Sequence, residues 1–232
     1  KSIYQIGFVG NTVNERDHSG KSTEAADERK LVTVMFADIS GFTALSQDMD
    51  PEDVRALMNR CFDALVPAID AYGGTVDKFI GDEIMAIFGA PVAYENHVER
   101  ALQAALDMQA SLNRFNELEG SQLAMHVGVN TGTVLAGGVG SLGRRQYSVM
   151  GDAVNLAARL KDAAPTGTIL AGPATFRLGS PLFAFDSLEP LTVKGRSDPV
   201  AVHRLTGRVA DAPRRGSAGP SSPLVGREAE LI

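Results

Sequence analysis

The order of strand-like and helix-like segments between Leu31 and Leu205 is the feature that most constrains the fold. Apolar residues recur at strand spacing or at helical spacing, in the order strand, helix, strand, strand, helix, strand. The expected segments are a strand at 31–36, a helix from Asp50-Pro51, strands at 75–80 and 83–88, a helix at 95–118 and a strand at 123–129. This order predicts an α+β fold with a ferredoxin-like βαββαβ core.

Capping residues predict where individual elements begin. Asp50 is expected to cap the first helix with Pro51 in its first turn, and Pro67 is expected to kink that helix. Asp152 is expected to cap a later helix over 153–163. Further strands, appended to the core, are expected at 147–150, 168–171, 183–186, 191–193 and 200–205.

The two ends of the chain differ from its middle. Residues 11–30 carry almost no large apolar residues and many charges, so residues 1–30 are expected to be a flexible lead-in to a domain over 31–205. Residues 206–223 are rich in Pro, Gly and Ser and predict a linker. Residues 224–232 turn apolar again, which predicts the start of another domain that this chain contains only in part.

Composition narrows the kinds of partner. The chain has 22 Lys plus Arg and 28 Asp plus Glu, so its net charge of −6 lacks the basic footprint of a general nucleic-acid or membrane-surface binder. Its one cysteine, Cys61, cannot form an internal disulfide, which is typical of a cytoplasmic protein. No segment reaches the roughly 18 apolar residues of a membrane helix. We therefore expect a cytoplasmic protein that binds no nucleic acid and has no membrane span in this chain.

Two acidic residues, Asp38 and Asp82, stand where strands end. Asp38 follows the first apolar strand, and Asp82 lies in the Gly-Asp turn between the second and third strands. Neighbouring strands bring such ends close together, so the two carboxylates are expected to converge, which suits Mg²⁺ with a bound phosphate. Backbone N–H groups at Gly41, Phe42 and Thr43 are expected to meet that phosphate. The alternative is that Asp82 serves only its turn and Asp38 only caps a short helix.

The positions of other polar residues make them candidates for substrate binding. Asn155 and Arg159 are four residues apart on one predicted helix face, where they could hold a ribose and a phosphate, and the alternative is a solvated face. Lys78 lies four residues before Asp82, and the alternative there is a cation on the exposed face of a strand. His126 is expected to be a hydrogen-bonded core residue and not a metal ligand.

Three segments together resemble a known enzyme family. VTVMFADISGFTALS, VDKFIGDEIMAIFG and YSVMGDAVNLAARL, in this order and spacing, resemble the class III nucleotide cyclase catalytic domain over about residues 31–205. The resemblance implies two Mg²⁺ or Mn²⁺ ions, held by Asp38, Asp82 and the carbonyl of Ile39.

The same resemblance assigns residues to the nucleotide. Lys78 and Ser148 occupy the two positions with which the family selects adenine, so ATP is the expected substrate. Lys194 is the expected phosphate contact in a late hairpin, with Arg196 as the adjacent candidate. The expected reaction is adenylyl cyclase activity, which forms 3′,5′-cyclic AMP and pyrophosphate.

The resemblance also implies a homodimer with shared active sites. In the family the metal site of one subunit faces the purine-selecting and the transition-state residues of its partner. The purine-selecting residues are matched here by Lys78 and Ser148, and the catalytic pair that acts at the transition state is matched by Asn155 and Arg159. This chain carries both halves, so a two-fold symmetric pair is expected to complete two identical sites.

Ser148 points to a subgroup of the family. It replaces the Asp of many membrane-bound adenylyl cyclases and resembles the subgroup related to the soluble, bicarbonate-responsive adenylyl cyclases, so bicarbonate is an expected activator. In that subgroup a large ATPase-like region often follows the cyclase domain, and VGREAEL near the end of the chain resembles its start.

Two other functions are consistent with parts of the sequence. A diguanylate cyclase is one, because GDEIMAIFG resembles the turn of that related family, although the NLAAR helix has no role in its chemistry. A non-catalytic nucleotide or bicarbonate sensor is the other, although every position at which the family acts is filled here.

Overall fold

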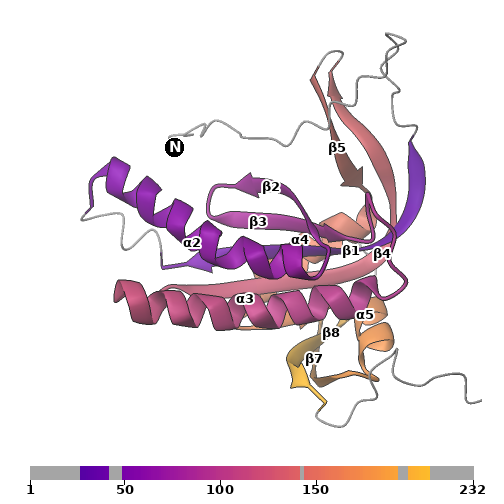
Figure 1. Cartoon of the computed structure of the whole chain (residues 1–232). Coiled ribbons are helices and arrows are strands. Elements are labelled where there is room, and N and C mark those ends of the chain that lie inside the picture. The colour runs from indigo at the N-terminus through magenta and orange to yellow at the C-terminus, as the bar shows by residue number, and fades with distance from the viewer. Residues whose placement is uncertain (1–26, 42–48, 142–143, 193–197, 210–232) are drawn as a thin grey trace, which may run out of the picture.

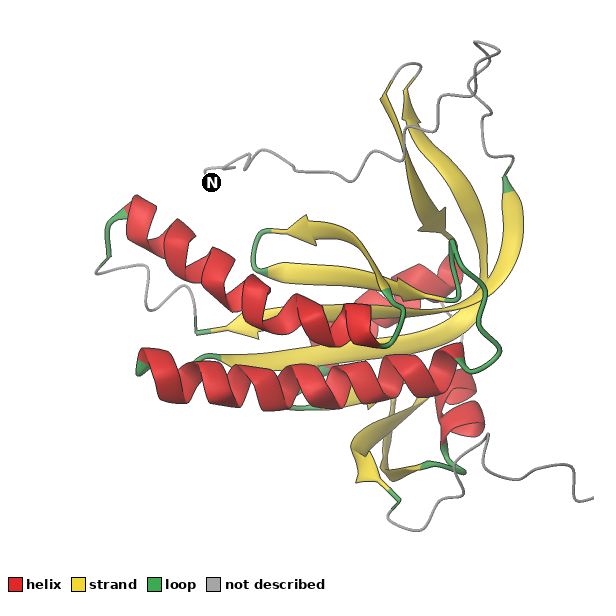
Figure 2. Ribbon diagram, in the orientation of Figure 1, coloured by secondary structure: helices red, strands yellow, loops and turns green. Residues whose placement is uncertain are grey.

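One sheet organises the chain, which the computed structural model describes over residues 27–41, 49–141, 144–192 and 198–209. Within these residues the sheet has eight strands, and four helices pack against it (Figures 1 and 2). The strands are β1 (Glu28–Ser40), β2 (Thr75–Ile80), β3 (Glu83–Phe88), β4 (Ala124–Ser141), β5 (Arg144–Met150), β6 (Ile169–Ala171), β7 (Phe183–Leu191) and β8 (Val200–Arg208). The helices are α2 (Pro51–Ala71), α3 (His97–Glu119), α4 (Asp152–Ala163) and α5 (Pro173–Gly179).

The strand order confirms the predicted ferredoxin-like core. The sheet runs β2-β3-β1-β4-β6-β8-β7, and β5 pairs with β4 outside this path. All pairs within β2-β3-β1-β4 are antiparallel, α2 connects β1 to β2, and α3 connects β3 to β4. Strands β6, β8 and β7 extend the sheet beyond β4, so the α+β fold with appended strands is confirmed.

Helices cover both faces of the core sheet. Alternate residues of β1 point to opposite faces, so Met35 and Ala37 belong to the core with α2 and α3, whereas Val34 and Phe36 belong to the core with α4. Figure 1 shows α2 and α3 side by side in front of the sheet and α4 behind it. Strand β1 is therefore buried on both faces, which accounts for its nearly continuous apolar sequence.

One predicted helix cap is confirmed in position and the other is corrected by the structure. Asp50 occupies the N-cap position of α2, but its side chain makes no capping hydrogen bond. Gly151, and not Asp152, is the N-cap of α4, because the chain enters this helix with a φ of 147°, which favours glycine. Asp152 instead supplies an acidic group to the first turn, and α2 continues through Pro67 to Ala71.

Several strands are longer than expected, and one helix was not predicted. Strand β4 continues from the expected end near residue 129 to Ser141, because it pairs with β1 along its first part and with β5 along its last part. These pairings override the glycines that make this segment look like a loop. Strand β7 is a single strand with two register shifts, whereas two separate strands were expected, and the seven-residue α5 was missed.

The packing of α4 on the sheet depends on Gly128 in β4. A methyl group at this position would lie 2.2 Å from the carbonyl oxygen of Ala157 and 2.3 Å from the amide nitrogen of Lys161. Both obstructing atoms belong to the backbone of α4, so neither can move without moving the helix. Gly128 therefore determines how closely α4, with Asn155 and Arg159 on it, approaches the sheet.

Replacing Gly128 with Ala is expected to destabilise the protein and to displace α4. Overpacking against a rigid backbone costs about 1–3 kcal/mol of the free energy of unfolding. Urea denaturation followed by circular dichroism measures this loss. Gly138→Ala in the same strand is the matched control, because its nearest neighbour would be the flexible Arg145 side chain at 3.4 Å, so a change of less than about 0.5 kcal/mol is expected. Equal losses in both variants would contradict this account of Gly128.

Candidate active site

The ends of β1 and β3 bring Asp38 and Asp82 together. Asp38 lies opposite Glu83 in the antiparallel register of β1 and β3, and Asp82 directly precedes Glu83 in the β2–β3 turn. The amide of Ile39 donates a hydrogen bond to the carbonyl of Asp82 at 3.3 Å, which ties the turn to β1. The two carboxylates that the sequence predicted to converge therefore share one end of the sheet.

Electrostatic repulsion accompanies this proximity. Burial raises the pKa of Asp82, and the negative charge of Asp38 raises it further, against opposing contributions that include the charges of Lys161 and His126. A carboxylate pair held in a partly desolvated place is unfavourable without a compensating positive charge.

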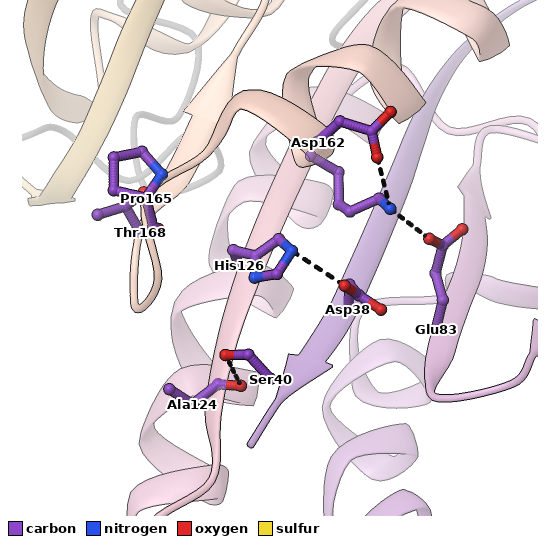
Figure 3. Close-up of polar contacts among 9 residues, drawn as sticks. Asp38, Ser40, Glu83, Ala124, His126, Asp162, Pro165 and Thr168 are labelled. Atoms are coloured by element: carbon purple, nitrogen blue, oxygen red, sulfur yellow. Dashed lines mark hydrogen bonds and ion pairs between the residues drawn. The ribbon is translucent and has the colours of Figure 1, made fainter. Parts of the chain in front are cut away.

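Two basic residues, His126 and Lys161, belong to the same charged cluster as the two aspartates. His126 in β4 lies opposite Asp38 in the β1–β4 register, and its Nε2 is 3.0 Å from Asp38 Oδ2, so it is hydrogen-bonded as predicted (Figure 3). Lys161 in α4 reaches Glu83 Oε2 at 2.7 Å and Asp162 Oδ1 at 2.8 Å. Burial would lower the pKa of Lys161, but the hydrogen bonds with Asp162 and Glu83 outweigh it and raise that pKa.

The Lys161–Glu83 pair was missed by the sequence analysis. Burial raises the pKa of Glu83, and the hydrogen bond from Lys161 offsets part of that effect. The pair joins α4 to the first residue of β3, next to Asp82. One signal was available, since Glu83 directly follows a candidate metal ligand, but nothing local identifies Lys161 as its partner, 78 positions further along the chain.

The Asp38–Asp82 pair fits a divalent cation. Mg²⁺ is commonly held by one or two carboxylates together with waters and substrate phosphates, and not by a cage made only of protein. Among the described residues no group of three or more His, Cys, Asp and Glu side chains is placed to hold a metal ion. Ile39 is 1% exposed, and its side chain belongs to the hydrophobic core. His126 Nε2 lies within hydrogen-bond distance of one oxygen of Asp38, and this contact can orient the carboxylate towards a metal ion.

A second cluster joins β2 to β5. Lys78 Nζ lies 3.4 Å from Ser148 Oγ, so the two residues predicted to select the purine lie together within one chain. Asp77, which the sequence analysis did not single out, lies between them, 3.0 Å from Lys78 and 2.9 Å from Ser148. The side chain of Asp77 is 2% exposed.

The catalytic pair predicted on α4 lies on one exposed face of that helix. The opposite face, with Leu156 and Ala157, is buried against the sheet and its neighbours. Neither Asn155 nor Arg159 has a side-chain hydrogen bond or ion pair with any residue that the structure describes, Asp38 and Asp82 included. The structure therefore does not join this pair to the two aspartates within one chain.

The expected phosphate-binding residues are described only in part. Gly41 directly follows β1 with a φ of 98°, a left-handed conformation that favours glycine. Phe42, Thr43, Lys194 and Arg196 lie outside the described residues.

Comparison with known proteins identifies the family. The family model for the adenylate and guanylate cyclase catalytic domain matches residues 24–207, and the chain belongs to this family. Adenylate cyclase 1 of Rhizobium meliloti is 35% identical over 197 residues, which are 82% of this chain and 30% of that protein. An adenylate cyclase of Anabaena cylindrica is 37% identical over 145 residues, 59% of this chain and 28% of that protein. The chain thus spans less than a third of these relatives.

Solved structures with the same fold include enzymes for both purines. The adenylyl cyclase CyaB from P. aeruginosa has a TM-score of 0.77 and 30% identity, covering 80% of this chain and 98% of that one. The guanylyl cyclase Cya2 has a TM-score of 0.75 and 32% identity, covering 80% and 96%. The fold and the family therefore leave the choice of purine to individual residues. No helix in the described ranges has the length and apolar character needed to cross a membrane.

Replacing Asp82 with Asn is expected to stabilise the protein when divalent cations are absent. The pKa of Asp82 is raised in the folded state, so the folded protein holds this proton more tightly than the unfolded chain does. The protonated form therefore contributes stability at low pH, and this contribution is lost as the pH rises through the raised pKa. At neutral pH the ionised Asp82 lowers the free energy of unfolding, and Asn removes this loss because it carries no charge. Thermal melts at neutral pH in EDTA should give a higher midpoint for Asp82→Asn than for the wild type.

Asp63→Asn is the control for this substitution. Asp63 is exposed on α2, so the same change of charge should leave the melting midpoint almost unchanged. Added Mg²⁺ should raise the midpoint of the wild type more than that of Asp82→Asn. A lower midpoint for Asp82→Asn than for Asp63→Asn in EDTA would show that the charge of Asp82 does not destabilise the folded protein.

Proposed function

We propose that this chain is an adenylyl cyclase domain that converts ATP to 3′,5′-cyclic AMP and pyrophosphate. The observation that carries the proposal is the contact between Lys78 and Ser148, in a family that includes both adenylate and guanylate cyclases. An ammonium group only donates hydrogen bonds, and adenine offers an acceptor nitrogen at its Watson–Crick edge where guanine carries an N–H. The Ser148 oxygen can accept a hydrogen bond from the exocyclic amine of adenine.

The remaining residues suit attack of the ribose 3′-oxygen on the α-phosphorus, with pyrophosphate as the leaving group. Asp38, Asp82 and the Ile39 carbonyl would hold two divalent cations, Mg²⁺ or Mn²⁺. Such cations supply a lower pKa for the 3′-hydroxyl and charge neutralisation for the triphosphate. Arg159 would stabilise the negative charge that develops on the α-phosphate, and Asn155 would orient the ribose for in-line attack. Phosphate contacts from Lys194, or its neighbour Arg196, and from the segment 41–43 are part of the proposal.

The exposed position of Asn155 and Arg159 supports a homodimer with shared sites. These two side chains face away from the sheet of their own chain, as a pair would that acts on the metal-bound nucleotide of a partner. Large apolar side chains are exposed on β2, β4 and β5, the strands that surround the Lys78–Ser148 contact, and they suit a protein interface. They are Phe79 (37% exposed), Ile80 (50%), Leu135 (38%), Tyr147 (37%) and Met150 (50%).

Two expectations from the sequence stay predictions. Stimulation by bicarbonate rests on Ser148 and on the resemblance to the soluble subgroup, and a cytoplasmic location rests on the single cysteine. Of the two alternative functions, a diguanylate cyclase would form a different product from GTP, and a non-catalytic sensor would form no product. Incubation of the chain with ATP or GTP and Mg²⁺ or Mn²⁺, followed by identification of the product, separates these readings from the proposed function.

Replacing Lys78 with Glu is expected to shift the substrate preference from ATP towards GTP. The carboxylate accepts hydrogen bonds where the ammonium donates them, so it opposes the adenine ring nitrogen and suits the N–H of guanine. The ratio of kcat/KM for ATP to that for GTP should fall at least about tenfold, the effect of one misplaced polar contact. Lys30→Glu, a cation in β1 paired with Glu28, is the control and should leave the ratio unchanged. An unchanged ratio in Lys78→Glu would rule out its assigned role.

A mixture of two inactive variants is expected to recover activity. Asp38→Ala and Arg159→Ala should each be nearly inactive alone, but a mixed dimer carries both lesions in one site and none in the other. Random pairing makes about half of the dimers mixed, so activity should recover to about a quarter of the wild-type level. Native mass spectrometry verifies the exchange of subunits. A mixture that stays inactive after verified exchange would reject shared sites.

A further inference from the structure

Asp77 lies at an irregularity of β2. In the pairing of β2 with β3, Val76 is opposite Ala86 and Lys78 is opposite Met85, so Asp77 is an extra residue without a partner in the register. Consecutive side chains of a regular strand point to opposite faces, whereas a bulge re-aims them. Here it lets Asp77 and Lys78 meet the same side chain, Ser148 of β5.

The contacts of Asp77 determine the direction of the Ser148 hydroxyl. Asp77 Oδ2 lies 2.9 Å from Ser148 Oγ and 3.0 Å from Lys78 Nζ. A carboxylate that is ion-paired to a lysine only accepts hydrogen bonds, so Ser148 must donate its proton to Asp77. Lys78 also only donates, and it faces the Ser148 oxygen at 3.4 Å. Both protein partners therefore leave the Ser148 oxygen as an acceptor towards any further group.

We infer that Asp77 is a positioning residue for purine specificity, which keeps Ser148 an acceptor of hydrogen bonds and so favours adenine over guanine. A free serine hydroxyl can rotate, donating to the guanine carbonyl or accepting from the adenine amine with similar ease. With its proton committed to Asp77, Ser148 matches only the amine. The inference rests on the proposed function, because it deepens the choice of ATP by the same site.

Burial strengthens this assignment. The Asp77 side chain is 2% exposed and Ser148 is 5% exposed, so water competes little for their hydrogen bond. The Lys78 side chain, at 36%, is the most open of the three, and a base edge would approach beside it. The rival explanation is that Asp77 only holds Lys78, in which case its effect on specificity would not depend on the Ser148 hydroxyl.

The test is a double-mutant cycle of Asp77→Ala and Ser148→Ala, read by nucleotide binding. The probes are 3′-deoxy-ATP and 3′-deoxy-GTP with Mg²⁺, which cannot cyclise because they lack the attacking hydroxyl, and calorimetry measures both affinities. Asp77→Ala should lower the preference for the adenine probe roughly tenfold in the wild-type background. In the Ser148→Ala background the same substitution should change the preference less than about twofold, because the hydroxyl that Asp77 orients is gone.

Two results would overturn the inference: an unchanged preference in Asp77→Ala, or an equal change in both backgrounds. Asp77→Leu, which fills the space without an acceptor, replaces Asp77→Ala in the cycle if that variant loses its cooperative melting transition. Turnover of ATP by the wild type is measured separately. Absence of cyclic AMP would reject the proposed function, whereas the binding cycle decides the role of Asp77 without any turnover.

Discussion

The pairing of β1 with β3 on one side and with β4 on the other is the constraint on which the rest of the structure depends. Its register sets Asp38 opposite Glu83 and opposite His126, and it places the β2–β3 turn, with Asp82, beside the end of β1. A slip of one residue in either pairing would turn Asp38 to the other face of the sheet and exchange the two apolar faces of β1. The core on both sides of β1 therefore enforces the geometry of the charged cluster, because a slip would force Met35 and Phe36 each into the core that packs around the other.

The two polar clusters place different demands on stability. At the end of β1, burial and the nearby charge of Asp38 work against the charge of Asp82, and Lys161 and His126 compensate only in part. Beside β5, by contrast, Asp77, Lys78 and Ser148 satisfy one another within the chain. The first cluster is thus suited to receive a cation, and the second is organised before any nucleotide arrives. Preorganisation of this kind supports discrimination between ligands, since the donor and acceptor directions are set in advance.

Helix α4 links these clusters to the proposed chemistry. Its inner face packs on the sheet at a distance that Gly128 permits, and Lys161 near its end reaches Glu83 beside Asp82. Its exposed face carries Asn155 and Arg159, which form no hydrogen bond or ion pair with the described aspartates of the same chain. One rigid element therefore supports the metal end of its own chain and presents a polar pair outward, an arrangement that a symmetric dimer can use twice.

Short-range patterns in the sequence were sufficient for the core order and for the resemblance to the cyclase family, because periodicity and turn residues act within a segment or between consecutive strands. The convergence of Asp38 and Asp82 was predictable because both residues stand where strands of the expected sheet end. Features that depend on distant partners were not predictable in this way. The length of β4 follows from its pairing with β1 and β5, the Lys161–Glu83 pair joins a helix to a strand, and the entry to α4 requires a glycine conformation that its sequence neighbours do not reveal. Asp77 is the clearest case, since its contacts depend on a bulge in β2 and on a serine 71 positions away. The sequence by itself determined which residues this protein has for its chemistry, and only the tertiary structure decided which of them meet, because hydrogen bonds and ion pairs form between neighbours in space.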